Sequence, residues 1–165
     1  MGSPLTATAN GTSVCNPSCI WANAMLGEPG ANVTSPISGV IVRWRTAGPY
    51  TGGPFELRVL SPAPGGGPPY TANGTSSPET PSGSAAQTFS TNLPIKAGDL
   101  IGLEEAVGSG VARTSSAPGS ATLAWNPALT DGEAGPPRMG TSPTSSCSST
   151  PTSPPHRTTH SASVD

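Results

Sequence analysis

Carboxylates are the side chains of this chain best suited to chemistry, and four of the nine fall in two short segments. Glu104 and Glu105 end an apolar run, and Asp131 and Glu133 flank a glycine. Glycoside hydrolases use a pair of carboxylates that lie about 5–9 Å apart. Because successive residues of a strand point to opposite faces, we expect Glu104 and Glu105 to diverge as solvated charges at a strand end.

The second acidic segment is a candidate cation site. Calcium is a hard cation that takes six to eight oxygen ligands, and Asp131 and Glu133 would supply two of them, with Asp99 as a third donor. The alternative is that Asp131 and the glycine after it simply form a turn. The sequence favours the turn, and no metal or other cofactor is predicted.

The remaining reactive side chains are cysteines and histidines. Both histidines, His156 and His160, lie near the C-terminus, so the rest of the chain lacks the imidazole of Ser-His-Asp and Cys-His catalysis. Cys15 and Cys19 frame the motif CNPSC, where Pro17 favours a turn. We predict a disulfide, with two free thiols as the alternative. A structural zinc ion takes four ligands, and no second Cys/His pair follows.

Two tyrosines are candidate ligand-binding residues. Tyr50 lies in a Gly/Pro-rich connection and Tyr70 follows a Pro-rich one. An exposed aromatic ring on a rigid sheet is a platform on which a sugar stacks, so both are candidate contacts for a cell-wall or extracellular glycan. The alternative is that both rings cover an edge of the fold. Trp44 is in phase with Val40 and Val42 along its strand and is expected in the core.

The elements that position these residues are strands. Runs with period-2 alternation, bounded by turn residues, predict about eight short strands at 19–25, 40–45, 55–59, 87–91, 93–95, 100–103, 111–114 and 123–125. No segment has a sustained helical period. The fold class is therefore all-β, an antiparallel β-sandwich of jelly-roll type.

The strands also predict which side chains face the core. Val40, Val42 and Trp44 are expected to point inward. A hairpin is expected to join this strand to the one at 55–59, where Glu56 would lie opposite an arginine of the first strand.

Composition limits the partners and the extent of the fold. The net charge is −2 and charged residues make up 10% of the chain, so no basic cluster favours nucleic acid. No apolar run reaches the length of a membrane span. Fourteen of the last 25 residues are Ser or Thr. We expect a flexible N-terminus over 1–13, a sandwich over 14–137 and a disordered tail over 138–165.

Several motifs together resemble a group of secreted actinobacterial β-sandwich proteins of unknown function. The matching stretches are CNPSC, SPISGVIVRWR, LRVLSP, YTANGTSSPETP, TFSTNLPIKAGDLIGL and WNPALTDGEAGPP, within about residues 14–137. The resemblance implies export, a cysteine staple near the N-terminus and a sandwich fold. It implies no known activity, so no catalytic residue is carried over.

Both ends of the chain depart from that group. No exported N-terminus is visible, and the tail replaces a final strand of the type ELLLNADVEPD. Back-translation with G+C-rich codons, begun at the third base of the Thr141 codon, gives EPDELLFKHADVAA. Our hypothesis is that the tail is a frameshift product. The alternative is a genuine Ser/Thr/Pro linker or stalk.

The sequence therefore predicts a protein that is not an enzyme. We expect an extracellular or cell-surface module with a structural or adhesive role. A carbohydrate-binding module is the first alternative. The second alternative is a polysaccharide-acting enzyme that uses Glu104 or Asp131.

Overall fold

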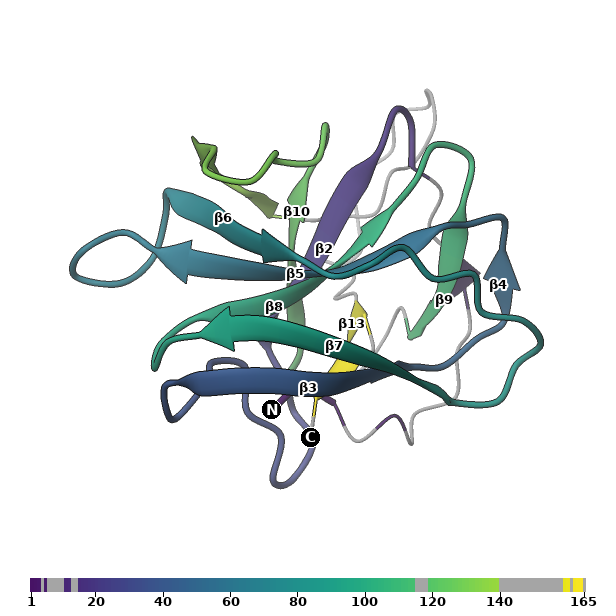
Figure 1. The fold of residues 1–165 in the computed structure, drawn as a ribbon, viewed down its shortest axis with the longest axis horizontal. Helices are drawn as coiled ribbons and strands as arrows, with labels where there is room; N and C mark the ends of the chain where they lie inside the picture. The colour runs from purple at the N-terminus through teal and green to yellow at the C-terminus, as the bar shows by residue number, and fades with distance from the viewer. Residues whose placement is uncertain are drawn as a thin grey trace, which may run out of the picture.

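A computed structural model describes residues 1–3, 5, 11–12, 15–114, 119–139, 159–160 and 162–164. Within these ranges the chain forms antiparallel strands and no helix, and no segment is a helix that would span a membrane. The all-β sandwich-like fold predicted from the sequence is confirmed. Figure 1 shows β3 (Gly39–Thr46) and β7 (Gln87–Ile95) running side by side, next to a larger sheet that contains β5 and β8.

The larger sheet has seven strands in the order β11-β6-β5-β8-β2-β10-β12. Its strands are β2 (Cys19–Met25), β5 (Phe55–Pro62), β6 (Tyr70–Thr75), β8 (Leu100–Glu105), β10 (Ala121–Trp125), β11 (Ala134–Gly135) and β12 (Arg138–Met139).

Two smaller sheets complete the described part of the chain. One has the order β14-β3-β7, and in the other β1, β4 and β13 all pair with β9. The remaining strands are β1 (Gly11–Thr12), β4 (Tyr50–Thr51), β9 (Gly110–Thr114), β13 (Thr159–His160) and β14 (Ala162–Val164).

The larger sheet buries apolar side chains on both of its faces. One face packs against the β3–β7 sheet and forms a core of Ile41, Trp44, Phe55, Leu57, Val59, Leu93, Ile95, Ile101 and Leu103. The other face carries a second core of Ile20, Ala22, Leu60, Tyr70, Ala72, Leu100, Leu123, Trp125 and Leu129. Consequently, a polar side chain at the centre of this sheet is buried whichever face it points to.

The predicted inward face of β3 is wrong for two of its three residues. Trp44 is fully buried, as expected, but Val40 and Val42 are 52% and 59% exposed, whereas Ile41 is 3% exposed. The β3–β7 register shifts between Ile41 and Arg43. At this shift one β3 residue, Val42, lies against two β7 residues, Thr91 and Asn92. The side chains of β3 therefore change phase between the two sides of the shift.

The predicted hairpin between β3 and β5 is also wrong. β3 pairs with β7, and β5 pairs with β6 and β8 in a different sheet. Glu56 therefore lies opposite Glu104 in the β5–β8 register, and not opposite an arginine of β3. The connection between the strands carries β4, which pairs with β9.

The two chain ends are described only in part. In the N-terminal segment predicted to be flexible, the Gly2 amide donates to the Asn32 carbonyl over 2.7 Å, and β1 pairs with β9. In the tail predicted to be disordered, β12 pairs with β10, β13 with β9 and β14 with β3. The rest of the tail, residues 140–158, 161 and 165, lies outside the described residues. This part of the chain includes His156.

Candidate functional site

The candidate acidic residues of β8 point to opposite faces of the larger sheet. Glu104 lies opposite Ile20 and Glu56 in the sheet registers, while Glu105 lies opposite Cys19 and Phe55. Their predicted divergence is confirmed. Their predicted solvation is wrong, because the Glu105 side chain is 0% exposed and that of Glu104 is 16% exposed. The second core explains this burial, since it covers the face on which Glu104 lies.

Arg58 joins the two carboxylates that were candidates for catalysis. Its guanidinium lies 3.2 Å from Glu104 Oε2 and 3.0 Å from Asp131 Oδ1, and its side chain is 6% exposed. It also donates to the Leu129 carbonyl over 2.5 Å and to the Thr75 hydroxyl. Thr75 in turn donates to Asp131 over 2.7 Å. We call Arg58, Thr75, Glu104 and Asp131 the Arg58 cluster.

The Arg58 cluster holds both carboxylates beside one planar guanidinium, at 3.2 Å for Glu104 and 3.0 Å for Asp131. Arginine presents five donors in a fixed fork, and it is the side chain best suited to such buried ion pairs. The three polar partners come from β6, β8 and the loop before β11, so the cluster ties three parts of the chain to β5. Removing the carboxylate of Glu104 or of Asp131 would break a contact that joins these elements.

Glu104 has a perturbed acidity. Burial raises the pKa of its carboxyl, Arg58 opposes that shift, and the negative charges of Glu56 and Asp131 reinforce it. A raised carboxyl pKa is also found in general acids. Here the guanidinium of Arg58 lies 3.2 Å from the carboxylate. The arrangement is therefore that of a compensated buried ion pair.

The candidate calcium ligands are each bound within their own turn or cluster. Asp99 is buried and accepts hydrogen bonds from the Ser61 hydroxyl over 2.6 Å and the Lys96 amide over 2.8 Å. Glu133 accepts from the amide and hydroxyl of Thr130. The structure does not bring Asp99, Asp131 and Glu133 together.

The Glu133 contacts define a turn. The hydrogen bonds from the Thr130 amide and hydroxyl lower the pKa of the Glu133 carboxyl. The Glu133 amide in turn donates to the Thr130 carbonyl over 2.9 Å. These bonds agree with the turn that the sequence favoured over a calcium loop.

Both candidate tyrosines pack against the fold, in agreement with the alternative to ligand binding that the sequence offered. Tyr70 is 9% exposed and packs edge-on against Trp125, with ring centroids 5.6 Å apart. Tyr50 is half-buried and packs against Phe55 at 5.7 Å, and burial raises the pKa of its hydroxyl. Because both rings pack against apolar side chains, neither forms the exposed platform on which a sugar would stack.

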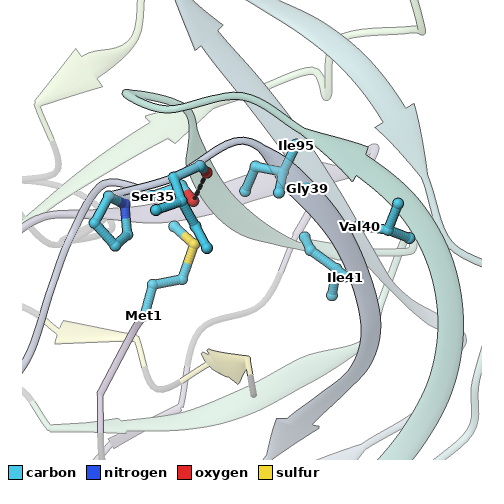
Figure 2. Close-up of a pocket in the computed structure, with 8 residues that line it drawn as sticks. Met1, Ser35, Gly39, Val40, Ile41 and Ile95 are labelled. Atoms are coloured by element: carbon cyan, nitrogen blue, oxygen red, sulfur yellow. Dashed lines mark hydrogen bonds between the residues drawn. The ribbon is translucent and has the colours of Figure 1, made fainter.

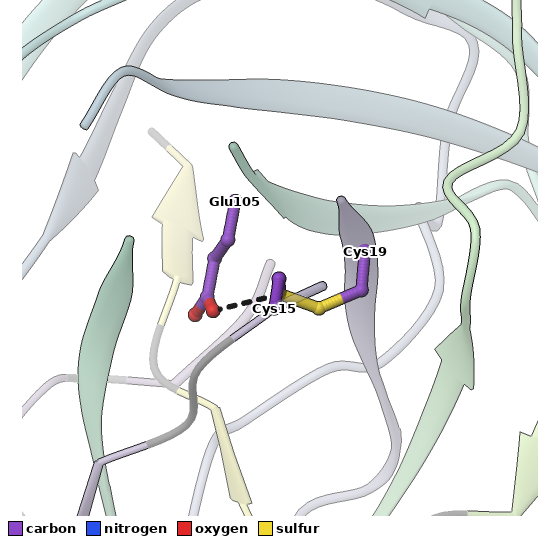
Figure 3. A group of neighbouring side chains, drawn as sticks. All are labelled: Cys15, Cys19 and Glu105. Atoms are coloured by element: carbon purple, nitrogen blue, oxygen red, sulfur yellow. Dashed lines mark hydrogen bonds between the residues drawn. A yellow bond between two sulfur atoms is a disulfide. The ribbon is translucent and has the colours of Figure 1, made fainter. Parts of the chain in front are cut away.

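The predicted disulfide between Cys15 and Cys19 is present, with Cα atoms 5.5 Å apart. Figure 3 shows the Glu105 carboxylate pointing at Cys15, whose sulfur lies 3.0 Å from Glu105 Oε2. The sequence did not predict that the Glu105 carboxylate is buried against the disulfide. A signal was present, because Ile101, Leu103 and Glu105 share one face of the strand by alternation.

An apolar cavity of about 270 Å³ lies where β3 begins. Figure 2 shows the Met1 side chain among the residues that line it. The Ser35 hydroxyl donates to the Ile37 carbonyl over 2.7 Å. Ile37 and Val40 line the cavity and are 70% and 52% exposed. None of the residues that line it carries a titratable side chain, so it offers contact surface without acid–base groups.

Comparison with known proteins adds no relative. No family model, no curated protein and no solved structure matches this chain.

Proposed function

We propose that the protein is a non-catalytic β-sandwich module of the extracellular space or cell surface, with a structural or adhesive role. The observation that carries the proposal is the Arg58 cluster. Glu104 and Asp131, which are the carboxylates best placed for a polysaccharide-acting enzyme, both pair with one buried arginine. Their contacts bind strands to one another, which is the role of a structural group.

The extracytoplasmic setting is supported by the Cys15–Cys19 disulfide. Disulfides form and persist in oxidising compartments and are rare in the cytosol. The resemblance to secreted actinobacterial sandwich proteins points the same way and stays a prediction. A carbohydrate-binding role through Tyr50 and Tyr70 has less support, because both rings pack against the core.

The test is co-sedimentation of the purified protein with insoluble cell-wall glycan. The proposal predicts saturable binding to the solid that a Glu104→Gln variant retains, because adhesion does not use the Arg58 cluster. A Tyr50→Ala variant separates the carbohydrate-binding alternative, which predicts that binding is lost. Absence of sedimentation above an inert protein of similar size and charge would contradict the adhesive role.

A further inference from the structure

The strongest unassigned group lies at the disulfide, on the face opposite the Arg58 cluster. Cys15, Cys19 and Glu105 each offer one ligand atom, and these atoms all lie within 4.8 Å of one another. The three side chains are 1%, 1% and 0% exposed. Figure 3 shows them converging from β2, β8 and the segment before β2. One oxygen of the Glu105 carboxylate, Oε2, lies 3.0 Å from the sulfur of Cys15.

The backbone holds these three residues in place independently of the disulfide. Cys19 and Glu105 lie directly opposite each other in the β2–β8 register. Cys15 is fixed by the turn after β8, because its carbonyl accepts from the Gly108 amide over 3.0 Å and its amide donates to the Ser109 carbonyl over 3.4 Å. Opening the disulfide would therefore leave the donor atoms on the same three anchors.

The donor set suits zinc once the disulfide is reduced. Zinc binds thiolate, imidazole and carboxylate ligands, and its cysteine pairs are separated by about two to four residues, as in CNPSC. In a tetrahedral site the sulfur atoms lie about 3.8 Å apart and a sulfur and a carboxylate oxygen about 3.5 Å apart.

We propose that Cys15, Cys19 and Glu105 form a zinc site in the dithiol form of the chain, with water at the fourth position. The inference goes beyond the proposed function, since it concerns the reduced protein. In the reaction, a phosphine reductant gives two electrons to the disulfide, takes an oxygen from water and becomes the phosphine oxide. The two thiols formed then each lose a proton as zinc binds.

The experiment uses the full chain with Cys147→Ser, so that only these two thiols remain. After reduction by a phosphine without oxygen, Co²⁺ is titrated and then displaced by Zn²⁺. We expect one cobalt per chain, with a thiolate-to-cobalt absorption band that zinc removes. The oxidised protein should bind neither ion. Glu105→Gln should weaken zinc binding about tenfold or more, and the matched control Glu56→Gln should leave it unchanged.

A second measurement covers variants or states that fail to fold. Zinc should protect the thiols of Cys15 and Cys19, but not that of Cys147, from alkylation in the reduced wild-type chain, as read by mass spectrometry. If reduction unfolds the chain, zinc should restore the folded near-ultraviolet spectrum, because metal binding and folding are then coupled. Failure of zinc to protect the thiols overturns the proposal. Equal zinc affinity in the wild type and Glu105→Gln overturns it as well.

Discussion

Arg58 gives the sharpest test of the idea that the acidic residues stabilise the fold. Replacing it with alanine leaves the carboxylate of Glu104, which is 16% exposed, without its cation. Breaking a buried ion pair from one side costs about 3–5 kcal/mol. The pair with Asp131, whose side chain is 55% exposed, adds about 0–1 kcal/mol. We therefore expect Arg58→Ala to lower the free energy of unfolding by about 3–5 kcal/mol.

Urea denaturation measures this loss. For a slope of about 2 kcal/mol per M, the midpoint should fall by about 1.5–2.5 M. Arg58→Lys keeps the charge without the fork, so its loss should be intermediate. Arg43→Ala, on the exposed side of β3, is the matched control and should change stability by about 0.5 kcal/mol or less. A loss below about 1 kcal/mol for Arg58→Ala would refute the reasoning.

Three further predictions concern acidity, close packing and strand phase. Because the folded pKa of Glu104 is raised, the stability contributed by its neutral form is lost as pH rises through that pKa. As the pH rises from about 4 to 7, Glu104→Gln should therefore gain stability relative to wild type. The carboxyl pKa of wild-type Glu133 is lowered, so Glu133→Gln should lose stability relative to wild type over the same interval. Urea denaturation at both pH values measures the two changes. Gly102→Ala should lower stability by about 1–3 kcal/mol in the same assay, since its methyl carbon would lie 3.2 Å from a backbone oxygen of β2. Ile41→Ala should cost about 2–4 kcal/mol by thermal or urea unfolding and Val42→Ala about 0.5 kcal/mol or less, and equal costs would contradict the register shift.

The sequence predicted most strands of the fold because period-2 alternation is strong in the buried segments. β2 matches its predicted bounds, and β5 and β8 begin at the predicted residues. β6 was missed, since its Asn73–Gly74 pair reads as a turn signal and only two of its side chains are buried. The register shift between β3 and β7 was missed because it depends on the pairing of the two strands, which alternation within one strand does not contain.

The site was predictable only in part, for a reason that lies in the sheet. Alternation along the strand at 55–59 indicates a single buried face, and on that basis it assigns Arg58, between Leu57 and Val59, to solvent. The second core reverses that assignment, and it depends on strands distant in sequence such as β10. The disulfide was predicted from local spacing alone, whereas its contact with Glu105 needs the β2–β8 register.

The most direct test of the central claim is release of soluble reducing sugar from cell-wall polysaccharide by the wild type and by Glu104→Gln. Both proteins are compared at concentrations at which both are folded. If Glu104 and Asp131 act structurally, both proteins should release no more sugar than a heat-denatured control. Release by the wild type that disappears in Glu104→Gln would contradict the account and make Glu104 a catalytic residue.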